Sequence, residues 1–181
     1  GSIHGCLISS VITRLEQTLC DCIRAMLQIH PILLSQDLDL GIRNVYNRPE
    51  DVGPDRLANA VGGVARYGAP FIIVDSGTAT TFDIVDNDGT YLGGIIMPGL
   101  EMSADALFQK TSRLPRIAIQ APQKVIGRST AEAINSGLIW GTTAAADRLI
   151  ALIREELGIP DCRAIATGGY ANLIAKESKT I

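Results

Sequence analysis

Residues 70–86, PFIIVDSGTATTFDIVD, decide the fold that this sequence predicts. The apolar run over residues 70–74 is typical of a buried strand, and the alternating run over residues 82–86 is typical of a second one. A tight turn with one carboxylate, one glycine and three threonines joins them. Asn87-Asp88-Gly89 then predicts a hairpin turn into a third strand, Thr90 to Met97. This three-strand meander, surrounded by helical patterns, predicts an α/β fold with a mixed sheet.

The turn between the first two strands has two interpretations. Gly77 allows a sharp turn and a close approach of a ligand to the main chain. The threonine hydroxyls and backbone N–H groups can donate to phosphate oxygens, and Asp75 can hold a cation beside them. The alternative is a hairpin whose Asp and Thr side chains bond to their own backbone. The chain has no G-x-x-x-x-G-K-[ST] loop, and the turn alone favours neither interpretation.

The composition is that of a globular protein, with 46% hydrophobic and 19% charged residues in 181. A net charge of −3 argues against a nucleic-acid surface. No run of about 18 apolar residues predicts a membrane span, and no signal peptide pattern is found, so we expect a cytoplasmic protein without a membrane partner. The four cysteines form no C-x-x-C pair, which favours buried reduced thiols.

Helices are predicted both before and after the meander in the sequence, from N-terminal signals and from the periodicity of apolar residues. Thr13 is predicted as an N-cap, with Glu16 completing a capping box. Pro54 suits the first position of a second helix, and Ser129 or Thr130 predicts the cap of a long one. A helix is also expected over residues 100–110 and another from residue 170, with short strands over residues 6–11, 31–34, 42–46 and 163–167.

The start of the second helix, Gly53-Pro54-Asp55-Arg56, is a candidate catalytic segment. Asp55 lies in the first helical turn, where the helix dipole favours the ionised carboxylate. It is a candidate for receiving the proton of a substrate hydroxyl in phosphoryl transfer, which depends more on positioning than on basicity. Arg56 can pair with a substrate carboxylate or with phosphate charge. The alternative is a helix-start acid beside a solvated arginine.

Three further glycine-containing segments have a functional and a structural interpretation each. Thr167-Gly168-Gly169-Tyr170 joins a strand to a helix, so its backbone N–H groups can face a ligand, although the segment taken alone favours a simple strand-to-helix turn. Gly127-Arg128-Ser129-Thr130 is explained by an N-cap alone. Gly93-Gly94, in the middle of the third strand, predicts a bulge or a close ligand approach.

Taken together and in this order, these segments resemble the type III pantothenate kinases, a family of the acetate and sugar kinase/Hsc70/actin superfamily. The resemblance runs from about Ile8 to the end of the chain. Its most specific stretches are GPDRLANA at 53–60, DSGTATTFD at 75–83, DGTYLGG at 88–94, MPGL at 97–100, GRST at 127–130 and TGG at 167–169. It implies a ribonuclease H-like actin/sugar-kinase fold, truncated here, with two lobes of mixed sheets flanked by helices. Residues 1–70 would be the remainder of the N-terminal lobe with the substrate-binding segment, and residues 71–181 the C-terminal lobe with a second phosphate turn and a long helix.

The resemblance also implies an activity: transfer of the γ-phosphoryl group of ATP to pantothenate, the first step of coenzyme A biosynthesis. Asp55 would be the proton acceptor. The pantothenate contacts would be Tyr46, Gly53, Pro54, Asp55, Arg56 and Thr130. The ATP contacts would be Thr78 with Gly77, Gly168 and Gly169, and Asp75 would bind the required monovalent cation, K⁺ or NH₄⁺. Mg²⁺ would accompany the ATP, and the protein would be a cytoplasmic homodimer with its pantothenate pocket near the interface.

The sequence departs from the family pattern most clearly at its start. The family begins with a strand and hairpin carrying Asp-x-Gly-Asn-Thr, which holds the ATP phosphates, and no such segment lies ahead of Ile8. The chain also stops soon after Thr167-Gly168-Gly169. We therefore expect little or no kinase activity from these 181 residues alone. The alternatives are a non-catalytic accessory paralogue of the same fold and a superfamily kinase for another small hydroxyl substrate.

Overall fold

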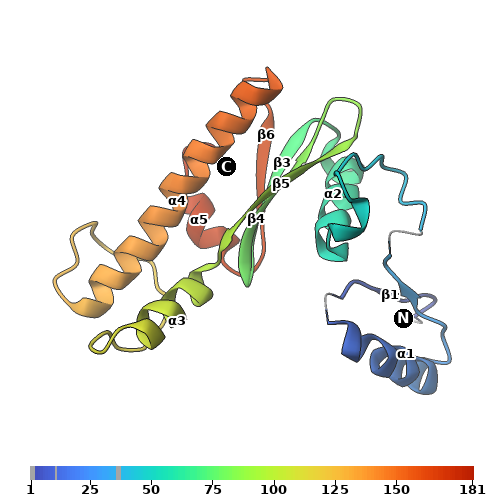
Figure 1. Cartoon of the computed structure of the whole chain (residues 1–181), viewed down its shortest axis with the longest axis horizontal. Helices are drawn as coiled ribbons and strands as arrows, with labels where there is room; N and C mark the ends of the chain where they lie inside the picture. The colour runs from blue at the N-terminus through green and yellow to red at the C-terminus, as the bar shows by residue number, and fades with distance from the viewer. Residues whose placement is uncertain (1–2, 11, 36–37) are drawn as a thin grey trace.

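The computed structural model describes residues 3–10, 12–35 and 38–181. It confirms the meander, with β3 (Phe71–Ser76), β4 (Ala79–Val85) and β5 (Tyr91–Pro98) paired antiparallel in that order. The strand β6 (Arg163–Thr167) pairs parallel with β3, so the sheet has the order β5-β4-β3-β6. The molecule is therefore α/β with a mixed sheet, as the sequence predicts (Figure 1).

Helices cover this sheet on both faces (Figure 1). On one face, α4 (Thr130–Leu157) contributes Ala146, Ile150 and Ile153 to a core with Ile72, Val74, Phe82 and Ile84. On the other face, α2 (Pro54–Tyr67) contributes Leu57 and Ala60 to a core with Phe71, Ile73, Val85 and Tyr91. Because side chains alternate across a strand, β3 buries both of its faces, which explains its unbroken apolar sequence.

The helix α2 lies close to the sheet because a glycine faces it. Gly63 is buried, and a Cβ atom placed on it would lie only 2.5 Å from Cζ of Phe71. The helix begins at Pro54 with Gly53 as its N-cap, which confirms the prediction. The close approach fixes the height of α2 above the sheet, and with it the position of Asp55 in the first turn.

The long helix α4 has the predicted cap. Ser129 is its N-cap, and the Oγ atom of this residue accepts a hydrogen bond of 3.2 Å from the backbone N–H of Glu132. The Glu132 carboxylate in turn accepts one of 2.7 Å from the backbone N–H of Arg128. The helix α3 (Leu100–Lys110) and the short α5 (Ala171–Glu177) contribute to a third core with the first turns of α4.

The N-terminal elements differ in detail from the predictions. Strands are found where residues 6–11 and 31–34 predict them, but they are the short parallel pair β1 (Leu7–Ile8) and β2 (Ile32–Leu33), and Val11 lies outside the described residues. The helix α1 (Thr13–Leu27) begins after Ile12, so the prediction that Thr13 is its N-cap is wrong. A 3₁₀ turn, η1 (Pro49–Asp51), precedes α2.

The predicted strand over residues 42–46 is wrong. The segment makes a single parallel bridge between Asn44 and Tyr91. The side chain of Asn44 accepts a hydrogen bond of 3.0 Å from the backbone N–H of Tyr46, so this donor is used locally and the ladder ends. The bridge nevertheless holds Tyr46 beside β5.

Two further findings concern the cysteines and the membrane. Cys20 and Cys162 are buried free thiols, whereas Cys6 is only partly buried and Cys22 is exposed, so the expectation of buried thiols is wrong for Cys22 and met in part for Cys6. Within the described ranges, no helix combines the length and the apolar character that a bilayer crossing requires.

Asp147 on α4 anchors the segment that follows α5. Its Oδ1 atom accepts hydrogen bonds from Ser178 Oγ at 2.5 Å and Thr180 Oγ1 at 2.6 Å, and the backbone N–H of Lys179 donates to Oδ2 at 3.1 Å. Burial acting alone would raise the pKa of Asp147, but these hydrogen bonds outweigh it and lower the pKa below its ordinary value. The ionised carboxylate is therefore the form that stabilises the fold.

We expect Asp147→Asn to lower the free energy of unfolding at pH 7 by about 1 kcal/mol or more. A carboxylate whose pKa is lower in the folded state contributes stability above its unfolded pKa, and this contribution is lost as the pH falls through the folded pKa. The difference between wild type and variant should therefore shrink from pH 7 to pH 3 in urea unfolding. Asp161→Asn, at an exposed position, is the control. A difference that stays constant over this range would contradict the prediction.

Candidate active site

The first turn of α2 presents Asp55 at the surface. Its side chain is exposed, and Oδ1 accepts a hydrogen bond of 2.9 Å from the backbone N–H of Arg56. This N–H also donates a hydrogen bond of 3.1 Å to the carbonyl oxygen of Gly53, the N-cap residue. Among the described residues nothing bonds Oδ2, which is therefore left to accept a proton. A carboxylate held by one oxygen at a helix N-terminus fits the predicted role of proton acceptor.

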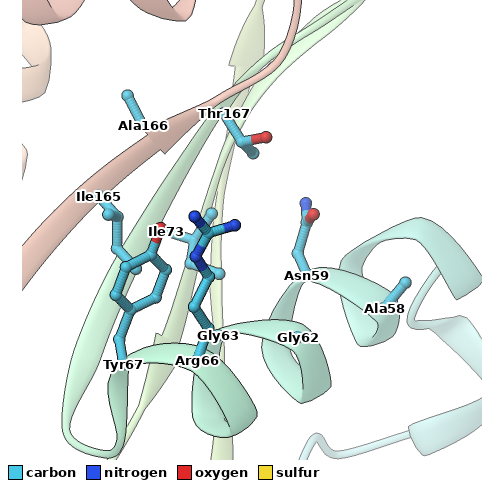
Figure 2. A pocket seen from close by; sticks show the side chains of 10 residues that line it. All are labelled: Ala58, Asn59, Gly62, Gly63, Arg66, Tyr67, Ile73, Ile165, Ala166 and Thr167. Atoms are coloured by element: carbon cyan, nitrogen blue, oxygen red, sulfur yellow. The ribbon is translucent and has the colours of Figure 1, made fainter.

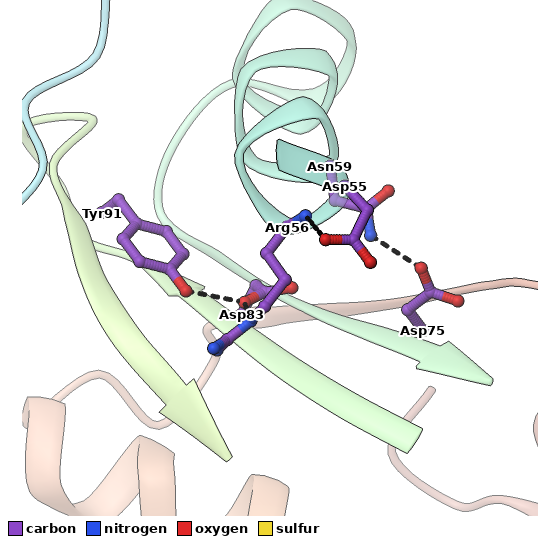
Figure 3. A network of polar contacts seen from close by, with 6 residues as sticks. All are labelled: Asp55, Arg56, Asn59, Asp75, Asp83 and Tyr91. Atoms are coloured by element: carbon purple, nitrogen blue, oxygen red, sulfur yellow. Dashed lines mark hydrogen bonds and ion pairs between the residues drawn. The ribbon is translucent and has the colours of Figure 1, made fainter. Parts of the chain in front are cut away.

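Arg56 is buried rather than solvated, against the structural alternative considered from the sequence. Only 7% of the residue is exposed. Its Nε donates a hydrogen bond of 2.7 Å to Oδ1 of Asp83, and the hydroxyl of Tyr91 donates one of 2.9 Å to the same oxygen (Figure 3). The guanidinium carbon lies 5.9 Å from the centre of the Tyr91 ring. These contacts form an Arg56–Asp83–Tyr91 network beneath the first turn of α2.

The electrostatics of this network follow from its burial. Burial raises the pKa of Asp83, opposed by the positive charge of Arg56 and by the hydrogen bond from Tyr91. Burial also works against the charge on Arg56, but the attraction of Asp83 outweighs it and raises the pKa of the guanidinium. Burial and the charge of Asp83 raise the pKa of Tyr91, so its hydroxyl stays protonated and remains a donor.

Sequence reasoning did not assign Asp83 or Tyr91 a role. The signal was present in the alternation of β4, because Asp83 lies between Phe82 and Ile84 and must point to the opposite face of the sheet. That face is covered by α2, and the side chains around Asp83 include the apolar Leu57, Ile73 and Val85. The Asp83 carboxylate is fully buried there. Because burying an unpaired charge is costly, a partner of opposite charge is expected next to it.

The glycine pair Gly93-Gly94 makes room for two side chains. A Cβ atom on Gly94 would lie 1.8 Å from the carbonyl oxygen of Phe82 and 2.3 Å from Nη2 of Arg56. Gly93 has a φ of +133°, and a Cβ atom there would lie 3.3 Å from the ring of Tyr46. The predicted bulge lies close by, as a register shift between Ile84 and Val85 of β4. Side chains of this chain, Arg56 and Tyr46, and not a ligand, approach the glycine pair closely.

Asp75, at the end of β3, is linked to the same helix. Its Oδ2 accepts a hydrogen bond of 2.8 Å from Nδ2 of Asn59, and Asn59 lies one helical turn after Asp55 on α2 (Figure 3). Sequence reasoning assigned no role to Asn59, although its i+4 spacing from Asp55 was a usable signal. The two candidate carboxylates thus lie on either side of one asparagine.

The turn after Asp75 meets the connection between β6 and α5. A Cβ atom on Gly168 would lie 2.5 Å from Oδ1 of Asp75 and 2.6 Å from the carbonyl oxygen of Ser76. The same Ser76 oxygen accepts a hydrogen bond of 3.2 Å from the backbone N–H of Tyr170. The structure therefore brings together two segments that lie some 90 residues apart in the sequence (75–81 and 167–170) and that sequence reasoning singled out separately.

The turn itself is tightly enclosed. The N–H of Gly77 donates to the carbonyl of Ala79 at 3.1 Å, and Thr78 is exposed at the tip. A Cβ atom on Gly99 would lie 2.2 Å from the carbonyl oxygen of Thr78. The alternative, in which Asp75 bonds its own backbone, does not describe this turn, because the carboxylate accepts from Asn59 instead.

A cavity of about 270 Å³ opens beside this arrangement, between α2 and β6. Figure 2 shows Asn59 and Thr167 at one end, and Arg66 and Tyr67 at the other. Gly62 and Gly63 form part of its floor. The cavity extends from the amide that contacts Asp75, so a ligand held near Asp75 would lie at its mouth.

The structure does not bring Thr130 to Asp55 within one chain. Thr130 is the first residue of α4, which lies on the opposite side of the sheet from α2 (Figure 1). It lines an apolar groove of about 870 Å³ between α3 and α4, together with Met102, Leu107, Ile134 and Leu138. Of the predicted site residues, Tyr46 lies near Arg56, and Thr78 and Gly168 lie near Asp75.

Among the described residues, no group of three or more His, Cys, Asp or Glu side chains is arranged to hold a metal ion. The oxygens that gather at Gly168 are the carboxylate of Asp75 and the carbonyl of Ser76. Carboxylate and carbonyl oxygens are ligands for hard cations rather than for transition metals. This pair of oxygens is therefore compatible with a hard cation that also binds ligands outside this chain.

Comparison with known proteins points to one family. The family model for type III pantothenate kinases matches residues 1–152. Three proteins named type III pantothenate kinase are similar to the chain: one from Koribacter versatilis (42% identity, covering 99% of this chain and 65% of the relative), one from Thermomicrobium roseum (44%, 97% and 67%) and one from Acidiphilium cryptum (42%, 100% and 68%). The chain thus spans about two thirds of the length of these relatives.

A solved structure shares the fold. A protein from Campylobacter jejuni, described as a conserved Baf family transcriptional activator, superposes with a TM-score of 0.62 at 21% identity. The match covers 99% of this chain and 75% of that one. At this identity the likeness concerns the fold alone.

Proposed function

The chain belongs to the type III pantothenate kinase family, and we propose that the intact protein transfers the γ-phosphoryl group of ATP to pantothenate, the first step of coenzyme A biosynthesis. One observation of the structure carries this proposal. Asp55, at the start of α2, lies one helical turn from Asn59, which bonds the Asp75 carboxylate beside the glycine-rich turns. A candidate proton acceptor is thereby held next to a candidate phosphate-binding region.

Asp55 acts as the proton acceptor in this proposal. Its Oδ1 is held by the Arg56 N–H, and its Oδ2 receives the proton of the pantothenate hydroxyl as the oxygen attacks the γ-phosphorus. Phosphoryl transfer passes through a loose transition state, so the main demand on the protein is to align the acceptor oxygen with the phosphorus. A carboxylate on a fixed helix start meets that demand.

The acceptor substrate binds along the segment Gly53, Pro54, Asp55 and Arg56, with Tyr46 on the neighbouring side. Tyr46 packs over Gly93 and Arg56 lies under Gly94, so both are held against the same stretch of β5. The guanidinium of Arg56 is buried and its charge is paired with that of Asp83, so its part in this segment is to fix the start of α2 rather than to present a free positive charge.

The nucleotide binds at the turn of Gly77 and Thr78 and at Gly168 and Gly169, with Mg²⁺ accompanying its phosphates. Asp75, with the carbonyl of Ser76, holds a monovalent cation, K⁺ or NH₄⁺, whose charge offsets that of the phosphates. The exposed hydroxyl of Thr78 and the backbone N–H groups of the Gly168-Gly169 connection supply neutral donors.

We also propose that the protein is a homodimer in which Thr130 serves the pantothenate site of a second copy. Thr130 begins α4, which lies on the other side of the sheet from α2, so a second copy is the source we propose for its contact with that site (Figure 1). The apolar groove between α3 and α4 that Thr130 lines is the surface we assign to the contact. Light scattering at a mass of one protomer would contradict this assignment.

The wider fold is proposed to be the ribonuclease H-like fold of the actin and sugar-kinase superfamily. The order of meander, long helix, parallel strand and helix, from β3 to α5, supports it. We propose that residues 1–70 belong to one lobe and residues 71–181 to the other, with α2 packed across the junction.

A direct assay tests the proposed function. The intact protein is incubated with ATP, Mg²⁺ and pantothenate in the presence of K⁺, NH₄⁺ or Na⁺, and 4′-phosphopantothenate is followed by mass spectrometry. We expect product with K⁺ or NH₄⁺. Product with another small hydroxyl acceptor but none with pantothenate would indicate a different superfamily kinase. No product with any acceptor or cation would favour a non-catalytic accessory protein.

A further inference from the structure

The Asp83 and Tyr91 side chains form the buried end of the polar network under α2, and the mechanism above gives them no part. We propose that both are positioning residues for Asp55, acting through Arg56. This inference rests on the proposed kinase function. In this inference, Asp83 and Tyr91 fix the position of the Asp55 carboxylate relative to the substrate.

An unbroken series of contacts connects the sheet to Asp55 (Figure 3). The Tyr91 hydroxyl donates to Oδ1 of Asp83 at 2.9 Å, and this oxygen accepts from Nε of Arg56 at 2.7 Å. The backbone N–H of Arg56 then donates to Oδ1 of Asp55 at 2.9 Å. Holding the Arg56 side chain therefore holds the peptide group that orients the Asp55 carboxylate.

The orientation of Arg56 depends strongly on Asp83. Nε is bonded to this carboxylate, whereas Nη2 is buried and has no hydrogen-bond partner among the described residues. Oδ2 of Asp83 is likewise buried without a partner. A guanidinium held through one nitrogen can rotate when that bond is lost. Tyr91 limits this freedom by fixing the accepting oxygen from the other side.

The surroundings make this arrangement rigid. Asp83 and Tyr91 are fully buried, and the missing side chain of Gly94 provides the space in which Nη2 lies. A buried ion pair adds little net stability compared with apolar side chains of the same size. Stability alone therefore explains poorly why the Arg56–Asp83 pair lies beneath the first turn of α2. A need to fix the orientation of the Arg56 side chain explains it better.

The test is a comparison of kinetics in single and double variants of the intact protein. We expect Asp83→Asn to lower kcat by roughly 10- to 100-fold, because a small displacement of a catalytic group has effects of this size. Tyr91→Phe should lower kcat less, and the KM for ATP should stay within about twofold in both variants. In an Arg56→Met background, adding Asp83→Asn should change kcat by less than about twofold. Effects that multiply in the double variant would overturn the proposal.

Ile84→Ala provides the matched control for a general loss of structure. Ile84 neighbours Asp83 on β4 but packs into the core on the α4 side. Its truncation removes buried volume and lowers the unfolding temperature. We expect kcat to remain within about twofold of wild type below that temperature. A fall in kcat as large as that of Asp83→Asn would show that any disturbance of β4 has this effect, and would refute a positioning role.

Hydrogen exchange separates this inference from the proposed function. The Arg56 amide donates to Oδ1 of Asp55 and to the carbonyl of Gly53, so its exchange reports on how firmly the first turn of α2 is held. Asp83→Asn should accelerate exchange at this amide by at least tenfold relative to the amides of α4, whether or not wild type phosphorylates pantothenate. An inactive wild type would refute the kinase function alone. Unchanged exchange in Asp83→Asn would refute the positioning role alone.

Discussion

Replacing Asp55 by asparagine is expected to lower kcat by roughly 10²- to 10⁴-fold, the usual contribution of a positioned acid–base group. The variant keeps the size and the hydrogen-bond acceptor of the side chain, so the Arg56 N–H retains its partner. It loses only the ability to take the proton from the pantothenate hydroxyl. The KM for pantothenate should therefore change by no more than a few fold.

The measurement is steady-state phosphopantothenate formation at saturating ATP and K⁺, with urea unfolding to confirm that the variant is folded. Asp51→Asn is the matched control, since Asp51 is an exposed acid four residues earlier whose side chain makes a surface ion pair with Arg48 at 3.5 Å. Its kcat should equal that of wild type. A turnover of Asp55→Asn within tenfold of wild type would remove Asp55 from the role of proton acceptor.

The sheet was predictable from the sequence because its signals are local. The apolar run over residues 70–74, the alternation over residues 82–86 and the turn Asn87-Asp88-Gly89 each define a strand or its end without reference to the rest of the chain. The segment 42–46 has a strand-like composition too, but the side chain of Asn44 captures the N–H of Tyr46 and stops the ladder. This competing hydrogen bond is local, but the composition of the segment does not show whether its backbone bonds to Asn44 or to a neighbouring strand.

The candidate site was predictable in its residues but not in its contacts. Asp55 and Asp75 stand out from their positions at a helix start and a strand end. That Asn59, one turn after Asp55, reaches Asp75 follows from the height of α2 above the sheet, which Gly63 sets by its closeness to Phe71. The burial of Arg56 likewise requires the pairing of β4 with β5, because only this pairing places Gly94 beside the guanidinium.

Gly168→Ala is expected to damage both stability and nucleotide binding. Gly168 has a φ of +94°, which L side chains rarely adopt, so an alanine there costs about 1–3 kcal/mol in strain. Its Cβ would also lie 2.6 Å from the Ser76 carbonyl oxygen and 2.5 Å from Oδ1 of Asp75, so the two turns must separate. Urea unfolding should report the loss of stability. Calorimetric titration at several K⁺ concentrations should show weaker ATP binding and a higher K⁺ requirement.

Gly169→Ala is the control, because Gly169 is the next residue in the sequence but has a different backbone conformation and different surroundings. A Cβ atom on Gly169 would meet no atom within 4 Å, and Gly169 is not among the glycines with positive φ. Gly169→Ala should therefore leave the free energy of unfolding within about 0.5 kcal/mol of wild type. Equal destabilisation by both substitutions would mean that the connection tolerates no side chain at all. Loss of ATP affinity in Gly168→Ala alone would instead identify the contact between Gly168 and Asp75 as the element that joins the two turns.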